Sequence, residues 1–515
     1  SGVEGAFMVD RDGNDLMAKA TNVSLLYLIV VTWLFGGGFS WGPYLVGGGG
    51  ILCLVFALRA ARLEGQQRWW SWRLLPWVLW LALVGISVWN PSHAPKDAEI
   101  GREFVVPHGK EARDTLGLVN PAVPVEHVVW LPTTTDAPRS GLYLFAFAGV
   151  FSFAVALAIL PMSRGDVRRW LTVIFANSII MTLIGLWWFF DDRDLVLGMY
   201  PTEGAQPFAS FHYKNNWTAY AVLSAAIGIG MGSYWWKAGR DLFRANSPTA
   251  CFVFATPLLV LTLPLIQSRA GVFIGTLLVM WLGVVVWNGY RVSERKSPWP
   301  LVVLAVAVGL LGWFSWSTTA PEIQRMLKKS ERQVEQVTAD EPTGRMVLFR
   351  DTVAMAKEKP WFGWGLASFS QVYPAFQGPE LYHKVNFRDG DFAWVPSYYE
   401  FAHCDWAQYW AETGVVGLLL LLGTPLLWFV YDLRKGRGNS ITHWLGVGCV
   451  LVMILAWFEF PFGAEAVSLL FAACFTFAGK YAVMSEQSRE RRKRRRRRED
   501  ERLRMKETAL ITERS

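Results

Sequence analysis

The chain has 515 residues, of which 52% are hydrophobic and only 18% are charged, and its mean hydropathy is +0.25. Soluble proteins carry nearer a quarter charged residues, so this composition argues against a string of soluble domains. The formal net charge of +8 is most concentrated in a C-terminal basic run. A basic run next to a membrane segment favours anionic lipid over nucleic acid as its partner.

Apolar runs long enough to cross a bilayer recur along nearly the whole sequence. A spanning helix needs roughly 20 apolar residues, and the pattern predicts about twelve such spans. In chain order they are 23–39, 42–60, 74–90, 140–162, 170–190, 217–236, 249–267, 270–290, 299–318, 405–431, 441–459 and 466–484. Gly36–Gly38 and Gly47–Gly50 make the first two spans less regular, although glycine also allows close contact between helices in lipid. We therefore predict an all-α membrane protein, with spans over 23–318 and 405–484.

Basic residues follow the even-numbered spans and thereby predict an orientation. Lys and Arg in short loops stay on the cytoplasmic side of the membrane. The clusters are Arg59, Arg62, Arg68 and Arg73; Arg164, Arg168 and Arg169; Lys237, Arg240 and Arg244; Arg291, Arg295 and Lys296; Arg434, Lys435 and Arg437; and Arg491–Arg498. All of them fall on one side of a twelve-span chain, so we predict an inner-membrane protein whose two termini, 1–22 and 485–515, are cytoplasmic.

The opposite, periplasmic side receives the long connections, 91–139, 191–216 and 319–404. Loops of this length inside a compact protein are usually functional, so 319–404 is expected to be a large periplasmic loop with a role of its own. It is expected to contain an amphipathic helix over 321–338 and a second helix over 344–358, which ends before Pro360. The basic tail on the other side is expected to be a solvated, disordered anchor at an anionic leaflet.

Polar residues gather at two places where spans meet the predicted outer face. Gln267–Gly271, between spans seven and eight, contains Arg269, and an arginine near hydrocarbon is unfavourable unless it snorkels, pairs or lines a wet cavity. Phe211–Trp217, at the start of span six, offers His212, Lys214 and Asn215. A snorkelling arginine and an interfacial aromatic anchor are equally good explanations of these two segments by composition alone.

A third group of polar residues runs from the long loop into span ten. Arg345 begins the second loop helix, and Gly363 and Gly365 permit a tight turn after it. His403 and Asp405 stand where the chain enters the membrane. A single histidine there is more often structural, yet histidine is also the residue best suited to general base work near neutral pH.

Together the three places suggest a reaction at the outer face. Arg269 and Arg345 are permanent cations able to clamp phosphate oxygens, and His403 is placed to take a proton from an incoming hydroxyl. A phosphate-linked leaving group held by arginines needs no metal. Asp389 and Asp391 alone are a weak metal signal, so no metal and no cofactor are expected.

These motifs, in their order and spacing over roughly 140–460, resemble the O-antigen ligase and O-antigen polymerase superfamily. The resemblance is carried by segments that would each be weak alone. They are Lys214–Trp217, Ser268–Gly271, Gly344–Arg345, Pro360–Gly365 with Ser368–Phe369, Ala402–Asp405 with Gln408, and Glu412–Gly417. Cys404 departs from the pattern, since asparagine or serine is more familiar there, and the 91–139 loop is longer than usual.

The resemblance implies a GT-C-like membrane glycosyltransferase that acts on the periplasmic side without a metal. Its donor would be an oligosaccharide on undecaprenyl pyrophosphate, and its acceptor lipid A-core in ligases or a growing glycan in polymerases. By motif, Arg269 and Arg345 would hold the donor pyrophosphate, His403 would be the general base, and Lys214 a further donor contact. His212, Asn215, Asp405 and Glu412 are expected to serve the acceptor or support the site.

Two other classes of function remain open at this stage. A transporter or flippase for a lipid-linked saccharide fits the number of spans, although no repeated halves with paired broken helices are visible in the sequence. A scaffold of an envelope assembly complex that uses the basic tail is the third reading. The leading hypothesis is inverting glycan transfer to an acceptor hydroxyl; ligase and polymerase are not distinguished by these residues.

Overall fold

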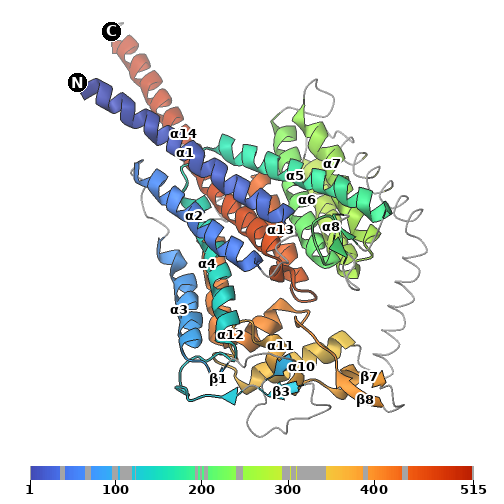
Figure 1. The fold of residues 1–515 in the computed structure, drawn as a ribbon. Coiled ribbons are helices and arrows are strands. Elements are labelled where there is room, and N and C mark those ends of the chain that lie inside the picture. The colour runs from blue at the N-terminus through green and yellow to red at the C-terminus, as the bar shows by residue number, and fades with distance from the viewer. Residues whose placement is uncertain are drawn as a thin grey trace.

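A computed structural model describes residues 2–34, 41–63, 71–94, 102–104, 119–121, 123–191, 195–197, 200–201, 207–238, 247–292, 344–386, 392–431 and 439–512, together with 302, 305 and 309. Over these ranges the protein is mainly helical, and long helices run side by side in a bundle (Figure 1). A smaller cap of short helices and strands covers one end of that bundle (Figure 1).

The bundle contains helices from both halves of the chain. They are α1 (Gly2–Trp33), α2 (Gly42–Leu63), α3 (Leu75–Trp89), α4 (Ala137–Ile159), α5 (Arg164–Asp191), α6 (Lys214–Lys237), α7 (Pro248–Leu265), α8 (Arg269–Val292), α12 (Asp405–Tyr431), α13 (Ser440–Leu455) and α14 (Glu465–Thr512). A 3₁₀ turn, η2 (Ser71–Leu74), leads into α3, and another, η6 (Pro461–Gly463), leads into α14.

The cap is built from short pieces. Its helical elements are α10 (Gly344–Glu358), α11 (Phe369–Val372), η3 (Tyr373–Ala375) and η4 (Pro379–Leu381). Four two-stranded sheets are described: β1 (His93–Ala94) with β4 (Val123–Pro124), β5 (Leu195–Val196) with β6 (Tyr200–Pro201), and β7 (Tyr382–Asn386) with β8 (Phe392–Pro396) are antiparallel, whereas β2 (Arg102–Phe104) and β3 (Val119–Pro121) are parallel. The longest pair, β7 and β8, aligns His383 with Val395.

Nine helices of the described chain are long and apolar enough to cross a membrane, so this is a multi-pass membrane protein. They coincide with nine of the predicted spans. Two further predicted spans, 217–236 and 441–459, fall on α6 and on the shorter α13. The predicted span 299–318 and the predicted helix 321–338 lie outside the described residues. The total of twelve and the GT-C-like arrangement therefore stay predictions.

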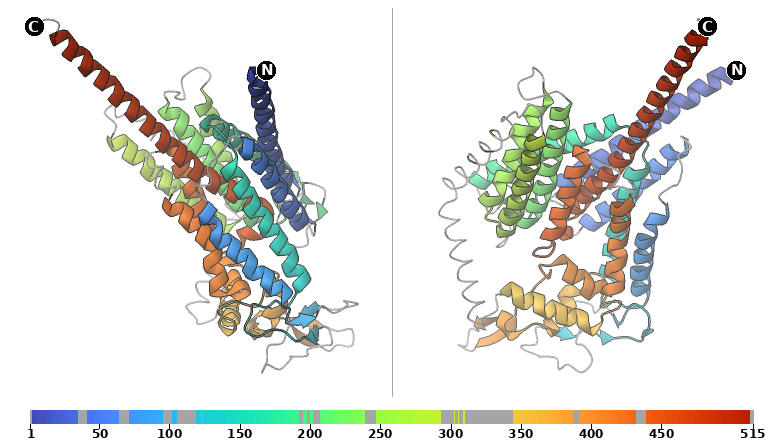
Figure 2. Two further views of the ribbon diagram at one scale, coloured as in Figure 1. Left: turned by 90° about the vertical axis from the view of Figure 1, so that its left-hand side faces the viewer. Right: turned by 180° about the vertical axis from the view of Figure 1, so that it is seen from behind.

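The capped end of the bundle and the end that holds the two termini are opposite each other. Figure 2 shows the start of α1 and the end of α14 projecting from one end of the bundle, while the cap with α10, α11, β7 and β8 lies at the other. This arrangement agrees with the predicted grouping of the long connections on one side. Which side of the membrane each end occupies stays a prediction.

Glycine brings α2 and α4 into close contact. Gly50 and Gly149 face each other so closely that a Cβ on either would overlap the backbone of the opposite helix. Small residues of this kind allow helix backbones to approach in lipid, where helix association depends on packing. The irregular glycine run at the start of the second span thus serves a helix contact, as expected.

The basic tail corrects one expectation, because it is helical and not disordered. α14 continues without a break from Glu465 to Thr512. The tail is rich in Arg and Glu, which are both good helix formers. An ion pair between Arg495 and Glu499, one turn apart, adds to that preference. The prediction of a disordered tail was based on charge alone and was wrong.

Candidate functional site

A buried carboxylate, Glu459, is the centre of the polar residues at the capped end of the bundle. It lies in the short connection between α13 and α14, and its side chain is only 1% exposed. The first residues of α6, α8, α10 and α12 surround this connection. A buried carboxylate is unstable unless it is paired and hydrogen-bonded, so its partners define the site.

Arg345 supplies the paired charge. It is the second residue of α10, and its Nη1 lies 2.8 Å from Glu459 Oε1 and 3.4 Å from the carbonyl oxygen of Phe458. The arginine side chain is 46% exposed, in contrast to the carboxylate. Its guanidinium therefore bridges the buried carboxylate and the open space at the end of the bundle.

His403 approaches the same carboxylate from the start of α12. Its Nδ1 lies 3.5 Å from Glu459 Oε2, at the outer limit of hydrogen-bond distance. His403 has a φ of 51°, in the left-handed region that is unfavourable for residues other than glycine. Such strain persists only where the surroundings hold the backbone on both sides, and it is common at functional sites.

The backbone around His403 is held in that way. On one side, the Ala402 N–H donates to Gln408 Oε1 at 3.0 Å. On the other, the Asp405 N–H donates to the carbonyl oxygens of Ala456 and Glu459, at 2.9 and 3.3 Å. The strained histidine is thus fixed relative to the segment that carries its carboxylate partner.

Tyr213 is the third side chain on Glu459, and it begins a chain of hydrogen bonds to α8. The Tyr213 hydroxyl donates to Glu459 Oε2 at 3.2 Å and accepts from Asn215 Nδ2 at 2.9 Å. Asn215 Oδ1 accepts in turn from the Ser268 hydroxyl at 2.5 Å, and Ser268 Oγ accepts from the Gly271 N–H at 2.8 Å. The predicted residue Asn215 therefore joins the starts of α6 and α8.

The charges on these groups follow from their contacts. Burial by itself would raise the pKa of Glu459, but the hydrogen bond from His403 and the positive charge of Arg345 outweigh it and hold the pKa below its ordinary value. Burial raises the pKa of Tyr213, and the adjacent Glu459 charge raises it further. The site at neutral pH therefore consists of an ionised carboxylate, a neutral phenol and an arginine.

Arg269 and Lys214 stand at the edges of this cluster. Arg269 is the first residue of α8, and it interacts electrostatically with Arg345, Glu459 and Tyr213. Lys214 is the first residue of α6 and follows Tyr213 directly, and His212 comes just before Tyr213. The side chains of Lys214 and His212 are partly buried. The predicted cations thus come from three different helices to one end of the bundle.

Asp405 and Glu412, both predicted to support the acceptor or the site, have structural partners. Asp405 is 3% exposed and its Oδ2 accepts from the Phe462 N–H at 3.0 Å, which ties the start of α12 to η6. Asp405 therefore positions the connection that carries Glu459. The structure does not bring Glu412 onto Glu459, Arg345 or His403.

Glu412 instead holds the loop between α10 and α11. Its carboxylate accepts from the Ala367 N–H at 2.9 Å, the Phe369 N–H at 3.3 Å and Gln408 Nε2 at 3.1 Å. The same loop pairs with the backbone of α12: Trp364 N–H donates to the Ala411 carbonyl at 2.9 Å and Val415 N–H donates to the Pro360 carbonyl at 2.8 Å. We call residues 359–368 and 411–416, joined by these bonds, the interlock.

Glycines with positive φ make the interlock possible. Gly414 has a φ of 69° and interrupts α12, while Gly363 and Gly365 have φ values of 71° and 108°. A Cβ at Gly414 would overlap the Trp361 carbonyl group, and one at Gly363 would overlap the backbone of Glu412. The turn predicted at Gly363 and Gly365 is present, and it shapes a structural joint.

Two residues of the cluster, Glu459 and Tyr213, were absent from the sequence-based site. Tyr213 was passed over within an aromatic segment that composition explains as an anchor. Glu459 stood at the end of a predicted span, and a carboxylate beside the membrane boundary is itself an indication of a functional site.

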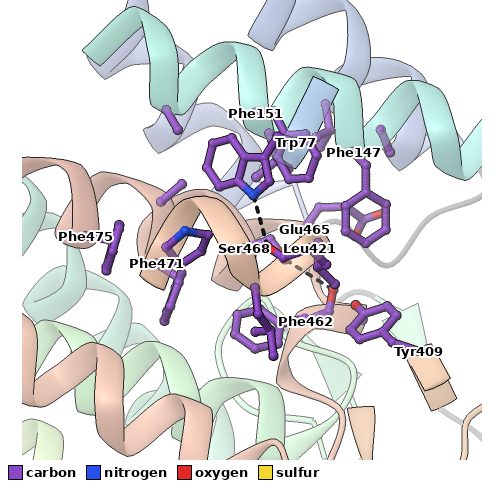
Figure 3. A pocket seen from close by; sticks show the side chains of 18 of the residues that line it. Trp77, Phe147, Phe151, Tyr409, Leu421, Phe462, Glu465, Ser468, Phe471 and Phe475 are labelled. Carbon is purple, nitrogen blue, oxygen red and sulfur yellow. Dashed lines mark hydrogen bonds between the residues drawn. The ribbon is translucent and has the colours of Figure 1, made fainter. Parts of the chain in front are cut away.

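An apolar cavity adjoins the cluster through the residues that follow Glu459. It has roughly 1040 Å³ of open space and lies among α3, α4, α12 and α14, with aromatic side chains over much of its wall (Figure 3). Phe462 of η6 lines it together with Glu465 and Ser468 at the start of α14, and the Ser468 hydroxyl donates to the Phe462 carbonyl at 3.2 Å. Glu459 is thus only three residues from this wall.

No group of three or more His, Cys, Asp or Glu side chains is placed to hold a metal ion within the ranges that the structure describes. The cluster offers one carboxylate and one imidazole, together with cations that would repel a metal ion. Its composition suits an anionic ligand better, because arginine presents several donors in a planar fork.

Comparison with known proteins bears on this geometry. Residues 254–422 match the family model described as O-antigen ligase, and this stretch contains Arg269, Arg345 and His403 as well as the interlock. No curated protein matches the chain. Lys214, Tyr213 and Glu459 lie outside the matched residues. The match confirms, over residues 254–422, the resemblance to the O-antigen ligase and polymerase superfamily that was drawn from the motifs.

Proposed function

We propose that this protein transfers a glycan from undecaprenyl pyrophosphate to an acceptor hydroxyl at the periplasmic face of the bacterial inner membrane. The observation that carries the proposal is the convergence of Arg345, His403 and Tyr213 on the buried Glu459, with Arg269 within electrostatic reach. A strained histidine beside a carboxylate and near two guanidinium groups, of which that of Arg345 is exposed, has the parts that such a transfer needs.

The arginines are proposed to hold the donor pyrophosphate. Arg345 and Arg269 lie close enough for their positive charges to repel each other. A pyrophosphate would relieve that repulsion. The same contact would stabilise the charge that grows on the leaving group as the sugar departs. Lys214, at the start of α6, is proposed as a further contact with the same group.

His403 is proposed as the general base. With the Nδ1–H directed at the Glu459 carboxylate, the imidazole would keep its Nε2 lone pair for a proton acceptor role. The carboxylate fixes this tautomer and stabilises the imidazolium that forms. The contact of 3.5 Å is long, as such contacts often are without a substrate bound.

The proposed step is a single displacement. The acceptor oxygen forms a bond to the anomeric carbon while the bond from that carbon to the pyrophosphate oxygen breaks, and the acceptor proton passes to His403 Nε2. Attack from the side opposite the leaving group inverts the anomeric configuration. No metal takes part, because the arginines supply the charge that stabilises the departing pyrophosphate.

The apolar cavity supports a lipid-linked donor. It opens among α3, α4, α12 and α14, and its wall reaches within three residues of Glu459 (Figure 3). A polyprenyl chain in this region would leave its pyrophosphate close to the arginines. A larger side chain at a small residue of the cavity wall, such as Ala472→Phe, is expected to raise the KM for the lipid-linked donor more than it lowers kcat.

Deletion of the gene, with analysis of the surface glycans, tests the proposal and identifies the acceptor. Loss of all glycan-capped lipid would indicate a ligase, and single-repeat capping would indicate a polymerase. Loss of secreted polymer with intact lipopolysaccharide would indicate an exopolysaccharide enzyme. Purified protein in liposomes that moved a lipid-linked saccharide across the bilayer, yet never joined it to an acceptor, would instead indicate a transporter.

A further inference from the structure

A second polar cavity lies at the end of the bundle away from Glu459. It has roughly 790 Å³ of open space. Its lining comes from the ends of three helices and from the middle of a fourth: Arg164 at the start of α5; Tyr234, Lys237 and Ala238 at the end of α6; Asn439 and Ser440 at the start of α13; and Tyr481, Ser485, Ser488 and Arg489 in the middle of α14. The 24 residues of α6 run from the cluster around Glu459 to this cavity. A helix of that length spans roughly 35 Å, so the two sites are distinct.

The charged residues of this cavity are all basic. Arg164, Lys237 and Arg489 line it, and its described lining contains no acidic residue. Arg168 lies at its edge, where its Nη1 donates to the Tyr481 hydroxyl at 3.1 Å and its guanidinium covers the Tyr234 ring at 4.9 Å. The nearby Asp166 is engaged by Ser163 and Arg169.

Neutral donors surround these cations and give the cavity a fixed floor. Tyr481 is 2% exposed and Ser485 8% exposed, so the inner wall is buried. Asn439 Nδ2 donates to the Ser485 hydroxyl at 2.8 Å, while its Oδ1 accepts from the Ile441 N–H at 3.0 Å and caps α13. The cavity therefore offers hydroxyl groups on a rigid floor and positive charges around its mouth.

We propose that this cavity binds a phosphate ester. Several cations together with hydroxyl donors are the groups that recognise phosphate oxygens in proteins. The cavity lies between long helices of the bundle, and basic pockets between membrane-crossing helices bind anionic phospholipids. The headgroup phosphate of such a lipid, or the phosphate of a soluble ester, is the expected ligand. Binding there would fix the start of α5, the end of α6 and the start of α13 relative to the middle of α14.

Purified full-length protein in nanodiscs provides the test. Thermal unfolding is measured in phosphatidylcholine alone, in phosphatidylcholine with phosphatidylglycerol, and in phosphatidylcholine with inorganic phosphate; bound lipid is measured by native mass spectrometry. The test variant is Arg164→Gln with Lys237→Gln. The control is Arg169→Gln, which removes a neighbouring cation that is 84% exposed and does not line the cavity.

The proposal predicts that phosphatidylglycerol raises the Tm of the wild type and of the control, and that its affinity for the double variant falls roughly tenfold to thirtyfold, since each lost cation weakens attraction to an anionic lipid about fivefold. A stabilisation by inorganic phosphate that the double variant loses would support the same site with a soluble ligand. Equal Tm shifts and equal lipid retention in wild type and double variant would overturn the proposal, as would indifference of the wild type to both additions.

Discussion

Two buried glutamates, Glu459 and Glu412, lie near the capped end of the bundle, and their side chains are 1% and 2% exposed. Glu459 is bound by ionisable side chains from α6, α10 and α12, one of which is half-exposed. Glu412 is bound by two backbone N–H groups and one amide. Equal burial thus conceals opposite roles: the first carboxylate organises groups able to act on a ligand, and the second holds a loop in place.

The motifs that carry the resemblance divide in the same way between these two glutamates. Arg345 and His403 meet at Glu459, whereas the Pro360–Gly365 and Glu412–Gly417 segments meet each other in the interlock. The interlock lies between α10 and α12, so it fixes the two elements that carry Arg345 and His403. Its residues are expected to govern stability, and those of the cluster to govern rate.

The largest effect is expected from Gly414→Ala in the interlock. A side chain at a φ of 69° costs about 1–3 kcal/mol, and overlap with the Trp361 carbonyl group adds to that cost. We expect little folded protein after detergent extraction and a strongly lowered Tm. Gly446→Ala in α13 is the control, because nothing lies within 4 Å of its added Cβ. Equal Tm values for the two variants would refute the structural role of the interlock.

The sharpest contrast is expected between Glu459→Gln and Glu412→Gln. The first should lower the transfer rate about 100-fold, since the amide neither stabilises an imidazolium nor pairs with Arg345, and it should change the Tm little because the half-exposed Arg345 stays hydrated. The second should lower the Tm while the folded fraction keeps its rate. The transfer rate and the Tm are measured on the same preparations of both variants. A lowered Tm for Glu459→Gln and a lowered rate for Glu412→Gln would mean that the two glutamates have the opposite roles.

A smaller effect is expected on stability in acid. The pKa of Glu459 is lowered below its ordinary value of 4.5 in the folded protein, so its contribution to stability is present above about pH 4.5 and is lost as the pH falls through the folded pKa. Between pH 5 and pH 3 the Tm of the wild type should fall more steeply than that of Glu459→Gln. Parallel curves would show that Glu459 is not ionised in the folded protein.

The smallest effect is expected on stability at high pH, and it comes from Lys359 in the interlock. Burial lowers the pKa of Lys359 to about 8 from its ordinary 10.5, while its Nζ donates to Thr133 Oγ1 at 3.3 Å. The unfolded chain binds more protons between these values, so stability should rise with pH through that window. The wild-type Tm should therefore increase from pH 8 to pH 10 relative to that of Lys359→Met. A constant difference between them would place Lys359 in solvent.

The apolar pattern of the sequence was sufficient to predict the long helices, because an apolar run of bilayer length has few stable structures other than a spanning helix. The 344–358 helix and the turn at Gly363 and Gly365 were also correctly predicted, since proline and glycine constrain the backbone locally. The tail was the exception: a charge run predicts solvation, yet Arg495 and Glu499 also favour a helix.

The cations of the site could be predicted from the sequence, whereas the buried carboxylate at its centre, Glu459, could not. Arg269, Arg345 and His403 stand out because such side chains are rare at membrane boundaries. Glu459 becomes meaningful only once α10 and α12 fold onto the connection after α13, a contact between segments more than 50 residues apart along the chain. Glu412 shows the converse, since its motif looked functional until its partners proved to be backbone N–H groups.

Transfer by purified His403→Ala tests the central claim most directly. A lipid-pyrophosphate-linked glycan and the acceptor identified by gene deletion are supplied to wild type and variant in matched nanodiscs, and the Tm of each preparation is recorded. We predict a rate lower by roughly 10²–10⁴-fold with an unchanged Tm, the loss typical of a missing general base. A variant that folds and transfers at the wild-type rate would contradict the role assigned to His403 and to the cluster around Glu459.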